Sequence, residues 1–457
     1  MNNECNSGLS RRSFMRTLGA ASVAATSLPA FAALQQAPAA GARRGGQAQG
    51  QGAGGGDFGD MTNDPLMVKI SSNENPLGPS DLARAAIAKV GNEGGRYNQQ
   101  YKSETVTVFS QQFGLKLPAG GGMGGGRRQA APGAAGATAP SAAEMTARQS
   151  GYVSFFPGSG GPLDLALISN ISPDKPLVMA DPSYEQGERA AALMKAPLFR
   201  VPLTKTGAHD VKAMVAAHPA PGAYYIVNPN NPTGTMTPKA DIVWLVNNKP
   251  AGSVVIVDEA YFHFSPDETS IDLVAADKDI IVMRTFSKVY GMAGLRAGFL
   301  IAKPELQAKL GKIGPGVSPN GSGVVSITTA AACTASISDP TLIPARRKIN
   351  ADIRANVLEW MDKSGYKYYP GSQANFFMAD VKRPGREFST LMRAEHVAIG
   401  RTWPSMPNYV RVTVGTQEEM DKFKVAFKKS YETAPLAATS YLNHIDNPSE
   451  LNRHLDA

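Results

Sequence analysis

The sequence predicts an α/β protein with a large domain, built on a mostly parallel, doubly wound sheet, and a smaller α+β domain. Short, nearly continuous apolar runs alternate with helical stretches in the first part of the chain, a rhythm typical of buried parallel strands joined by crossover helices. Beyond Pro340 one long helix precedes further strands and helices, which indicates the second domain. The 457 residues, 42% of them hydrophobic, suffice for both cores.

The expected elements follow in order along the chain. Sheet strands are expected at residues 176–180, 223–228, 253–258, 280–284 and 297–302, and helices at 81–90, 103–113, 187–195, 239–247 and 304–313. In the smaller domain we expect a helix at 343–364 and strands at 366–369, 376–381 and 410–414. The large domain is therefore expected at 96–335, and the smaller one at 61–95 with 336–435, before a tail at 436–457.

Residues 1–32 have the features of a signal peptide. Arg11 and Arg12 precede a short, weakly apolar run that ends in Ala30-Phe31-Ala32, an A-x-A cleavage pattern. The arginine pair resembles a twin-arginine signal, which addresses folded proteins for export; a chance pair in a disordered tail is the alternative. We therefore expect a periplasmic protein cleaved near Ala32. No stable membrane anchor is expected, because the apolar run is too short to span a bilayer.

Two low-complexity segments separate the ordered parts. The linker at 33–60 and an insertion at 118–148 are rich in small and polar residues and nearly lack large apolar side chains. Both are expected to be disordered, because they cannot offset the entropy of ordering by burial. A functional lid is the alternative for the insertion.

Charge and cysteine content exclude several functional classes. The net charge is +8, without a basic surface interleaved with aromatic residues, so no nucleic-acid partner is expected. The two cysteines, Cys5 and Cys333, are too few for a disulfide framework. Cys333 is expected to be a small buried residue, and no metal site is expected.

Four residues near the ends of expected strands carry the groups that pyridoxal phosphate requires. Asp258 and Tyr261 follow one apolar run, Lys288 follows the next in the sequence 285–288, and Arg296 comes two turns later if that segment is helical. The cofactor needs an amine for a Schiff base, a carboxylate at its ring nitrogen, a donor at its phenolic oxygen and a cation at its phosphate. Open α/β sheets bind ligands where their strands end.

Each of these residues also has an ordinary structural interpretation. Lys288 alone is typical of a solvated surface cation, Asp258 of a helix N-cap and Tyr261 of a packing aromatic. Arg411 alternates with apolar neighbours on an expected strand, so it either faces outward or forms a bidentate clamp for a carboxylate. The combination of these groups favours the functional interpretation.

Three further segments supply complementary groups. The glycine-rich turn before an expected helix exposes the backbone N–H groups of Ser159, Gly160 and Gly161 to a phosphate. Thr285 and Ser287 can add hydroxyl groups to the same phosphate. The remaining two segments place Asn231, held by Pro232, near the phenolic oxygen and Tyr184 against the ring.

Together these segments resemble the fold-type-I pyridoxal-phosphate enzymes, and more narrowly the class I/II aminotransferases of the histidinol-phosphate aminotransferase group. The matching segments appear in the family's order at 73–79, 96–97, 181–184, 228–234, 258–261, 285–288, 294–298 and 411–415. The resemblance implies the pyridoxal-phosphate transferase fold of type I.

The resemblance also implies a role for each candidate residue. Lys288 forms the Schiff base and moves the proton, Asp258 pairs with the ring nitrogen, and Asn231 and Tyr261 hold the phenolic oxygen. Tyr184 stacks on the ring, and Arg296 binds the phosphate. Arg411 binds the α-carboxylate of the substrate, and Asn75 and Arg401 are further substrate contacts, with Trp403 narrowing the pocket. Tyr97 reaches the cofactor phosphate of a partner subunit, which implies a homodimer.

The implied function is a ping-pong transamination between an amino acid and a 2-oxo acid. The alternatives are another pyridoxal-phosphate reaction on an amino acid (lyase, oxidase, cyclase or racemase) and a catalytically inactive binding protein. The chain departs from the family at Gly160 and Gly161, where an acidic or hydroxyl residue is usual, at the insertion, and in a shortened segment at 401–407. Because histidine biosynthesis is cytoplasmic and export is expected, histidinol phosphate is disfavoured as the physiological substrate.

Overall fold

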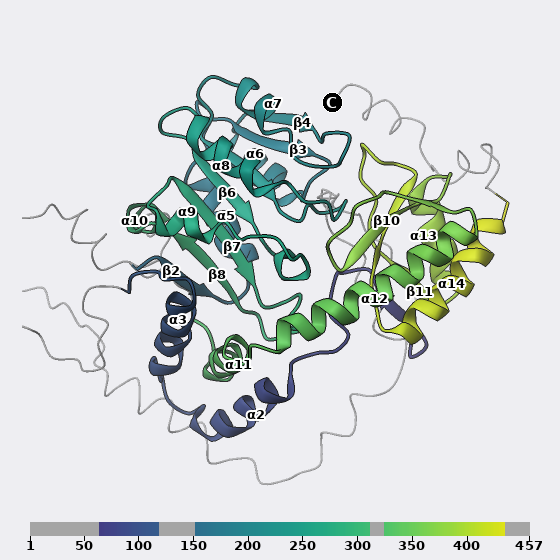
Figure 1. Ribbon diagram of the computed structural model, residues 1–457, viewed down its shortest axis with the longest axis horizontal. Coiled ribbons are helices and arrows are strands. Elements are labelled where there is room, and N and C mark those ends of the chain that lie inside the picture. Colours follow the sequence, from purple (N-terminus) through teal and green to yellow (C-terminus); the bar gives the residue numbers. More distant parts are fainter. Residues whose placement is uncertain (1–63, 118–150, 311–323, 435–457) are drawn as a thin grey trace, which may run out of the picture. The chain divides into compact units, whose positions relative to one another are not determined.

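The computed structural model describes residues 64–117, 151–310 and 324–434 (Figure 1). All of them belong to one compact unit, Gly54–Ala457. The expected signal peptide, the linker at 33–60, the insertion and the tail lie outside the described residues. Within the described ranges, no helix has the length and apolar character needed to cross a bilayer.

The main sheet has seven strands in the order β2-β8-β7-β6-β5-β3-β4 (Figure 1). The strands are β2 (Val153–Phe156), β3 (Leu177–Asp181), β4 (Leu198–Pro202), β5 (Ala223–Val227), β6 (Val254–Asp258), β7 (Ile280–Thr285) and β8 (Gly298–Ala302). Neighbours from β4 through β7 run parallel, whereas β8 is antiparallel to both β7 and β2. The mostly parallel sheet is confirmed. β8 reverses because a loop, without a crossover helix, joins it to β7.

Both faces of this sheet are buried, as a doubly wound arrangement requires. Along β6, Val255 and Val257 contribute to one apolar core, while Val254 and Ile256 contribute to the other. The second core is completed by α5 (Gly160–Ile168), α6 (Gln186–Met194) and α10 (Pro304–Leu310). The first core is completed by α3 (Gln100–Gln112), α7 (Val211–Ala216), α8 (Lys239–Asn248), α9 (Ile271–Ala275) and α11 (Ile327–Ile337). Cys333 of α11 is fully buried, as expected.

The edge strands β2 and β4 were not among the expected elements. In β4, partly and fully exposed residues surround the single buried residue Val201, and Pro202 ends the strand. Such a pattern lacks the continuous apolar run of the central strands and is typical of a sheet edge. β2 is fully buried but only four residues long, and it directly precedes the glycine-rich turn.

The second group of elements is a smaller α+β assembly. An antiparallel sheet has the order β12-β10-β9, and β1 pairs in parallel with β11. Its elements are β1 (Val68–Ile70), α12 (Leu342–Lys363), β9 (Lys367–Tyr368), β10 (Phe376–Asp380), α13 (Gly385–Ala394), β11 (Val397–Ile399), β12 (Tyr409–Thr413) and α14 (Gln417–Glu432). They enclose a third apolar core.

The chain before Tyr97 is divided between the two assemblies. β1 contributes Val68 and Ile70 to the core of the smaller assembly, as expected. However, α2 (Asp81–Val90) packs against α11, and its Ala83 lies in the core of the large sheet. The expected boundary near residue 95 is therefore wrong, because the chain changes assembly in the segment between β1 and α2. That segment crosses the candidate site.

Candidate active site

Lys288 lies in the loop between β7 and β8, and this loop consists of turns. The segment from Lys288 to Arg296 is not helical, because Gly291 and Arg296 have φ angles of +67° and +56°, outside the right-handed helical region. Lys288 Nζ donates to the Ser72 carbonyl oxygen at 3.1 Å. Burial, followed by the positive charge of Arg411, lowers the pKa of Lys288 to about 7. A substantial fraction of this amine is therefore neutral near neutral pH.

Asp258 ends β6 on the neighbouring strand and is buried. Its Oδ2 accepts a hydrogen bond from the Tyr225 hydroxyl at 3.3 Å, and its Oδ1 accepts one from the Ala260 backbone N–H at 3.0 Å. Burial raises the pKa of Asp258 to about 6. The helix N-cap interpretation is not supported, because only the short 3-10 turn Phe262–Phe264 follows. Sequence reasoning missed Tyr225, which lies in the apolar run of β5.

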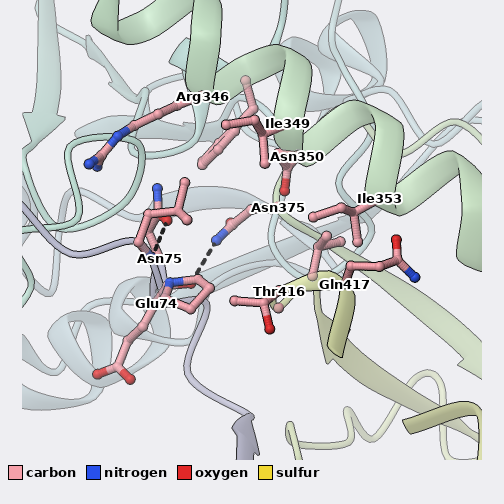
Figure 2. Close-up of a pocket in the computed structure, with 14 residues that line it drawn as sticks. Glu74, Asn75, Arg346, Ile349, Asn350, Ile353, Asn375, Thr416 and Gln417 are labelled. Atoms are coloured by element: carbon pink, nitrogen blue, oxygen red, sulfur yellow. Dashed lines mark hydrogen bonds between the residues drawn. The ribbon is translucent and has the colours of Figure 1, made fainter. Parts of the chain in front are cut away.

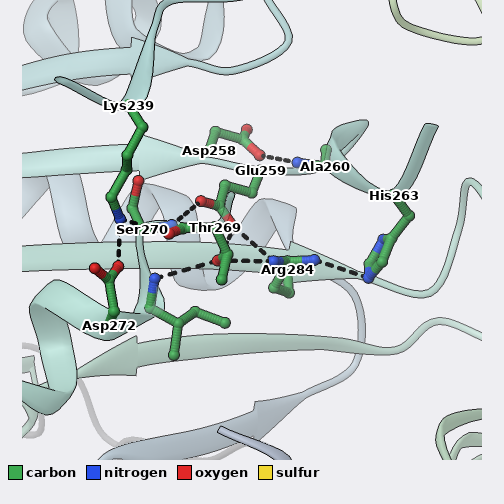
Figure 3. Close-up of polar contacts among 10 residues, drawn as sticks. Lys239, Asp258, Glu259, Ala260, His263, Thr269, Ser270, Asp272 and Arg284 are labelled. Carbon is green, nitrogen blue, oxygen red and sulfur yellow. Dashed lines mark hydrogen bonds and ion pairs between the residues drawn. The ribbon is translucent and has the colours of Figure 1, made fainter. Parts of the chain in front are cut away.

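A buried ion pair supports this end of the sheet. Glu259 Oε2 lies 2.8 Å from Arg284 Nη2, and both side chains are almost completely buried. Figure 3 shows Thr269 and His263 completing the network, through hydrogen bonds to Arg284 of 2.9 Å and 2.8 Å. Glu259 also accepts the backbone N–H of Ser270. Since a buried charge is tolerated only when it is paired and hydrogen-bonded, the network fixes the backbone next to Asp258.

Tyr261 and Asn231 lie on the same side of the site and are both buried. The Tyr261 hydroxyl accepts a hydrogen bond from Asn73 Nδ2 at 2.9 Å, and its ring centroid lies 5.4 Å from Lys288 Nζ. Asn231 Oδ1 accepts from Arg411 Nη1 at 2.7 Å, so its amide N–H groups are the ones that can donate to a ligand. Asn73 was not selected from the sequence. It is the first residue of the matching segment 73–79, and its φ of +54° is one that Asn tolerates.

The glycine-rich turn forms a cradle at the N-terminus of α5. Ser159 is the N-cap and makes no side-chain cap hydrogen bond, so the first N–H groups of the helix point at a ready site for an anion. Gly158 has a φ of +88°, and a Cβ there would overlap the Arg296 guanidinium. Arg296 Nη1 lies 3.5 Å from Ser287 Oγ, which in turn accepts from Thr285 Oγ1 at 3.0 Å. The residues predicted to bind the phosphate are therefore brought together.

Tyr184 follows β3 and is partly buried. Burial, with the negative charge of Glu185 next, raises the pKa of Tyr184 to about 12. The charges of Tyr261 and Asp258 also act on Tyr184, so its ring belongs to the same site. The Tyr184 hydroxyl therefore stays neutral at neutral pH, which is compatible with its predicted packing against a flat ring.

Arg411 faces inward from β12, which excludes the outer-face interpretation. Its side chain is buried, and Nη1 and Nη2 donate to Asn231 Oδ1 and the Ser71 carbonyl oxygen at 2.7 Å and 2.8 Å. The rings of Phe376 and Trp403 lie 5.6 Å and 5.4 Å from its Cζ. Burial lowers the pKa of Arg411 to about 10, so it remains a cation at neutral pH. A cation held so rigidly suits a carboxylate.

The other candidate substrate residues occupy different positions. Asn75 donates to the Val289 carbonyl oxygen at 3.0 Å and accepts from the Leu77 N–H at 3.1 Å. It lines a cavity of about 180 Å³. Ile349 and Ile353 of α12 line the opposite wall of this cavity (Figure 2). Asn75 thus holds the loop after Lys288, whereas Asn73 faces the site.

Arg401 and Tyr97 also differ in their surroundings. Arg401 forms an ion pair with Glu185, the residue after Tyr184. Tyr97 is 98% exposed and takes no part in the site of its own chain. Its predicted role toward a partner subunit stays a prediction.

The groups present fit pyridoxal phosphate. The site combines a partly neutral lysine amine, a buried carboxylate, and phenol and amide groups. It also contains an anion-binding turn in which Gly158 leaves no space for a Cβ. These are the groups that the cofactor requires for its carbonyl carbon, ring nitrogen, phenolic oxygen and phosphate. No cluster of three or more metal-binding side chains occurs in the described ranges.

Comparisons with known proteins give one consistent result. The model of the aminotransferase class I and II family matches residues 138–427, more than half of the chain. The protein named histidinol-phosphate aminotransferase 1 from Nitrosococcus oceani is 30% identical over 361 residues, which cover 78% of this chain and 86% of the relative. The histidinol-phosphate aminotransferase from Moorella thermoacetica is 28% identical over 372 residues, covering 79% and 85% of the two chains.

A solved structure shows the same fold. The histidinol-phosphate aminotransferase from Sinorhizobium meliloti, in complex with pyridoxal-5'-phosphate, superposes with a TM-score of 0.65 at 21% sequence identity. The superposition covers 79% of this chain and 90% of that structure. This likeness confirms the expected fold, with its mixed large sheet and smaller α+β assembly.

Proposed function

Because this chain belongs to the aminotransferase class I and II family, we propose that Lys288, Asp258 and Arg411 carry out its reaction together. The reaction is the pyridoxal-phosphate-dependent transfer of an amino group between an amino acid and a 2-oxo acid. The observation that supports these assignments is the convergence of the three side chains from β6, β12 and the β7–β8 loop, with the pKa of Lys288 lowered to about 7.

Each residue has one task in this proposal. The bound cofactor would supply an electron sink for the electron pair that remains when the substrate carbon loses its proton. Lys288 Nζ accepts that proton and returns it, because its amine is partly neutral at working pH. Asp258 holds the ring nitrogen, and Arg411 orients the substrate by its α-carboxylate.

The remaining ligands position the cofactor. Asn231 and Tyr261 hold the phenolic oxygen, and Tyr225 keeps the Asp258 carboxylate in place through its 3.3 Å hydrogen bond. Ser159, Ser287, Thr285 and Arg296 hold the phosphate. Tyr184 packs against the ring.

A coupled assay tests the proposal. The purified holoenzyme is supplied with an amino donor and a 2-oxo acid, and both products are quantified. We expect equal amounts of the new amino acid and the new 2-oxo acid, and a loss of rate of at least about a hundredfold in Lys288→Ala. The exposed Lys278 provides the matched control, Lys278→Ala. A cofactor absorbance band that persists unchanged in Lys288→Ala, or oxo acid formed without amino transfer, would contradict the proposal.

The physiological substrate in this proposal is an amino acid and not histidinol phosphate. The relatives are named for histidinol phosphate, and histidine biosynthesis takes place in the cytoplasm. We propose that this chain is exported, on the basis of Arg11, Arg12 and the Ala30-Phe31-Ala32 pattern. An exported enzyme would not meet that intermediate.

Cell fractionation tests the export. We expect the mature protein in the periplasm with an N-terminus directly after Ala32, already carrying its cofactor, because twin-arginine export transports folded proteins. Arg11→Lys together with Arg12→Lys should leave the uncleaved chain in the cytoplasm. Export is refuted if wild type and double variant are both cytoplasmic and uncleaved.

A further inference from the structure

The segment 401–407 of the smaller assembly packs against the loop that follows β3 of the large sheet. Arg401 forms an ion pair with Glu185. Trp403 Nε1 donates to the Ser183 carbonyl oxygen at 3.0 Å, and the Trp403 side chain is buried. Two parts of the chain more than 200 residues apart therefore form one wall of the site.

This wall lies beside the groups that act on the substrate. The Arg411 backbone N–H lies 3.4 Å from the Arg401 carbonyl oxygen, and Glu185 directly follows Tyr184. The charges of Arg401 and Glu185 both act on the pKa of Arg411, in opposite directions, and that of Glu185 raises the pKa of Tyr225 as well. A substrate held by its carboxylate at Arg411 thus presents its side chain to this wall.

The Glu185 carboxylate has an unused acceptor. Its Oε1 is taken by Arg401, whereas its Oε2 is buried and has no hydrogen-bond partner among the described residues. A buried acceptor without a partner costs free energy. A ligand that donates an N–H group to this oxygen removes that cost, so the wall favours a donor.

An anionic substituent would meet the opposite situation. The charge of Arg401 is already compensated by Glu185, and Arg411 is engaged by the α-carboxylate. Glu74 adds another carboxylate whose charge reaches Lys288. A phosphate or carboxylate on the side chain would therefore meet an arginine that is already paired with a carboxylate, which offers the anion little compensation.

We infer that Glu185 and Arg401 form the side-chain subsite, and that it selects amino donors whose side chain ends in an N–H group over donors that carry a phosphate or carboxylate there. Glu185 is the specificity-determining residue and Arg401 positions it. This inference rests on the proposed role of Arg411 in binding the α-carboxylate.

Steady-state kinetics of the holoenzyme test the inference with matched donors. L-Histidine and L-phenylalanine both carry a flat ring, but only histidine has ring N–H groups. We expect kcat/KM for histidine to exceed that for phenylalanine by at least about tenfold, because a site built for a hydrogen bond rejects the analogue that lacks it. L-Glutamine and L-glutamate form the second pair, because their side chains end in an amide N–H group and a carboxylate, respectively. We expect L-glutamine to be the better donor.

Substitution of the subsite gives a second measurement. In Glu185→Gln the histidine-to-phenylalanine ratio should fall toward unity, while L-glutamate should improve by about tenfold, because Arg401 is then free to bind an anion. Glu188→Gln is the matched control. Glu188 lies one turn further along α6 and pairs with Arg200 on the surface. The histidine-to-phenylalanine ratio of the Glu188→Gln variant should therefore equal that of wild type.

The outcomes separate this inference from the proposed function. Equal rates for histidine and phenylalanine in wild type, a preference for L-glutamate over L-glutamine in wild type, or an unchanged ratio in Glu185→Gln would each overturn the subsite. In all three cases transamination persists, so the proposed function stands. Loss of transamination from every donor, in a protein that keeps its cofactor absorbance, would overturn both. The wild-type comparisons need no variant and do not depend on the folding of Glu185→Gln.

Discussion

Burial moves the pKa values of Lys288 and Asp258 toward neutral pH. The pKa of Lys288 falls to about 7 and that of Asp258 rises to about 6, in each case chiefly because the charged form is desolvated. The shifts have opposite directions because one group is a cation and the other an anion. In the cofactor-free protein, both groups therefore change charge within a narrow range around neutral pH.

The lowered pKa of Lys288 makes the pH dependence of cofactor capture a test. Only the neutral amine reacts with the cofactor, so the rate should rise with pH up to about 7 and level off above it. Mixing cofactor-free protein with pyridoxal phosphate and following the absorbance measures this rate. Nα-acetyl-lysine is the control, because its free side-chain amine has a pKa of about 10.4. A protein rate that keeps rising to pH 9 in parallel with the control would contradict the lowered pKa.

Gly158 is the position in the cradle where a side chain cannot be accommodated. It has a φ of +88°, and the Arg296 guanidinium occupies the place that a Cβ would take. Any Cβ would displace the Arg296 guanidinium, the cation that we assign to the phosphate. The cradle therefore depends on a missing side chain as much as on the groups present.

Gly158→Ala should weaken cofactor binding by at least about tenfold, because Arg296 must move and charge-assisted hydrogen bonds to the phosphate are lost. Fluorescence titration of the cofactor-free protein measures the change. Gly252→Ala is the control: Gly252 has a φ of +83° but nothing lies near its Cβ position, so it introduces the same backbone strain without the clash. Equal affinities for both variants would show that Arg296 is not held against this turn.

Helix α14 carries the aromatic core of the smaller assembly. The helix begins with a capping box in which Thr416 and Glu419 accept each other's backbone N–H groups. Its buried Phe427 has ring centroids of other aromatic residues within 6.0 Å, namely those of Trp360, Tyr366, Phe388, Phe423 and Tyr431. This cluster fixes the sheet from which Arg411 projects.

Phe427→Ala should lower the free energy of unfolding by about 3–5 kcal/mol, through lost burial and the remaining cavity. Urea denaturation followed by circular dichroism measures the change. Val425→Ala on the same helix is the control, because Val425 is 73% exposed and should change stability by less than about 0.5 kcal/mol. A loss below about 1 kcal/mol for Phe427→Ala would mean that the cluster relaxes to fill the space.

Tyr97 has no role within its own chain that the structure reveals. A large side chain with 98% exposure is unusual for a residue in a segment that matches the family's order. We propose that two chains associate and that Tyr97 contributes to the phosphate site of the other copy, as the resemblance implies.

Mixed dimers provide a direct test of this exchange. Tyr97→Ala should bind cofactor weakly and Lys288→Ala should be inactive, but a mixture should regain activity. In the mixed dimer, the site with an intact Lys288 receives the intact Tyr97 of the other chain, and one active site per dimer is restored. The expected recovery is about a quarter of wild-type activity for random pairing of equal amounts. Activity no greater than the sum of the separate variants would exclude the exchange.

Much of the architecture could be predicted because local pattern determines it. The central strands are continuous apolar runs, and their carboxyl ends carry Asp258, Lys288 and Tyr184 where an open sheet binds ligands. The glycine-rich turn and the expected helix after it are also local signals. These elements were expected within a few residues of their observed bounds.

Other features could not be predicted because they depend on contacts between distant residues. Asn73 meets Tyr261, and Tyr225 meets Asp258, only after the strands and the segment behind β1 have packed together. Nothing in the local sequence distinguishes Tyr225 from Tyr224, which faces the other core. The side of the sheet that each faces is set by strand register.

The sequence by itself determined the α/β architecture and the cofactor chemistry, and it predicted which residues carry that chemistry, because hydrophobic periodicity and motif chemistry are properties of short segments. Packing of distant segments decided the division of the chain between β1 and α2 and the inward direction of Arg411. It also paired Glu185 with Arg401. The energies of such long-range contacts depend on which surfaces meet, and this information is distributed over the whole chain.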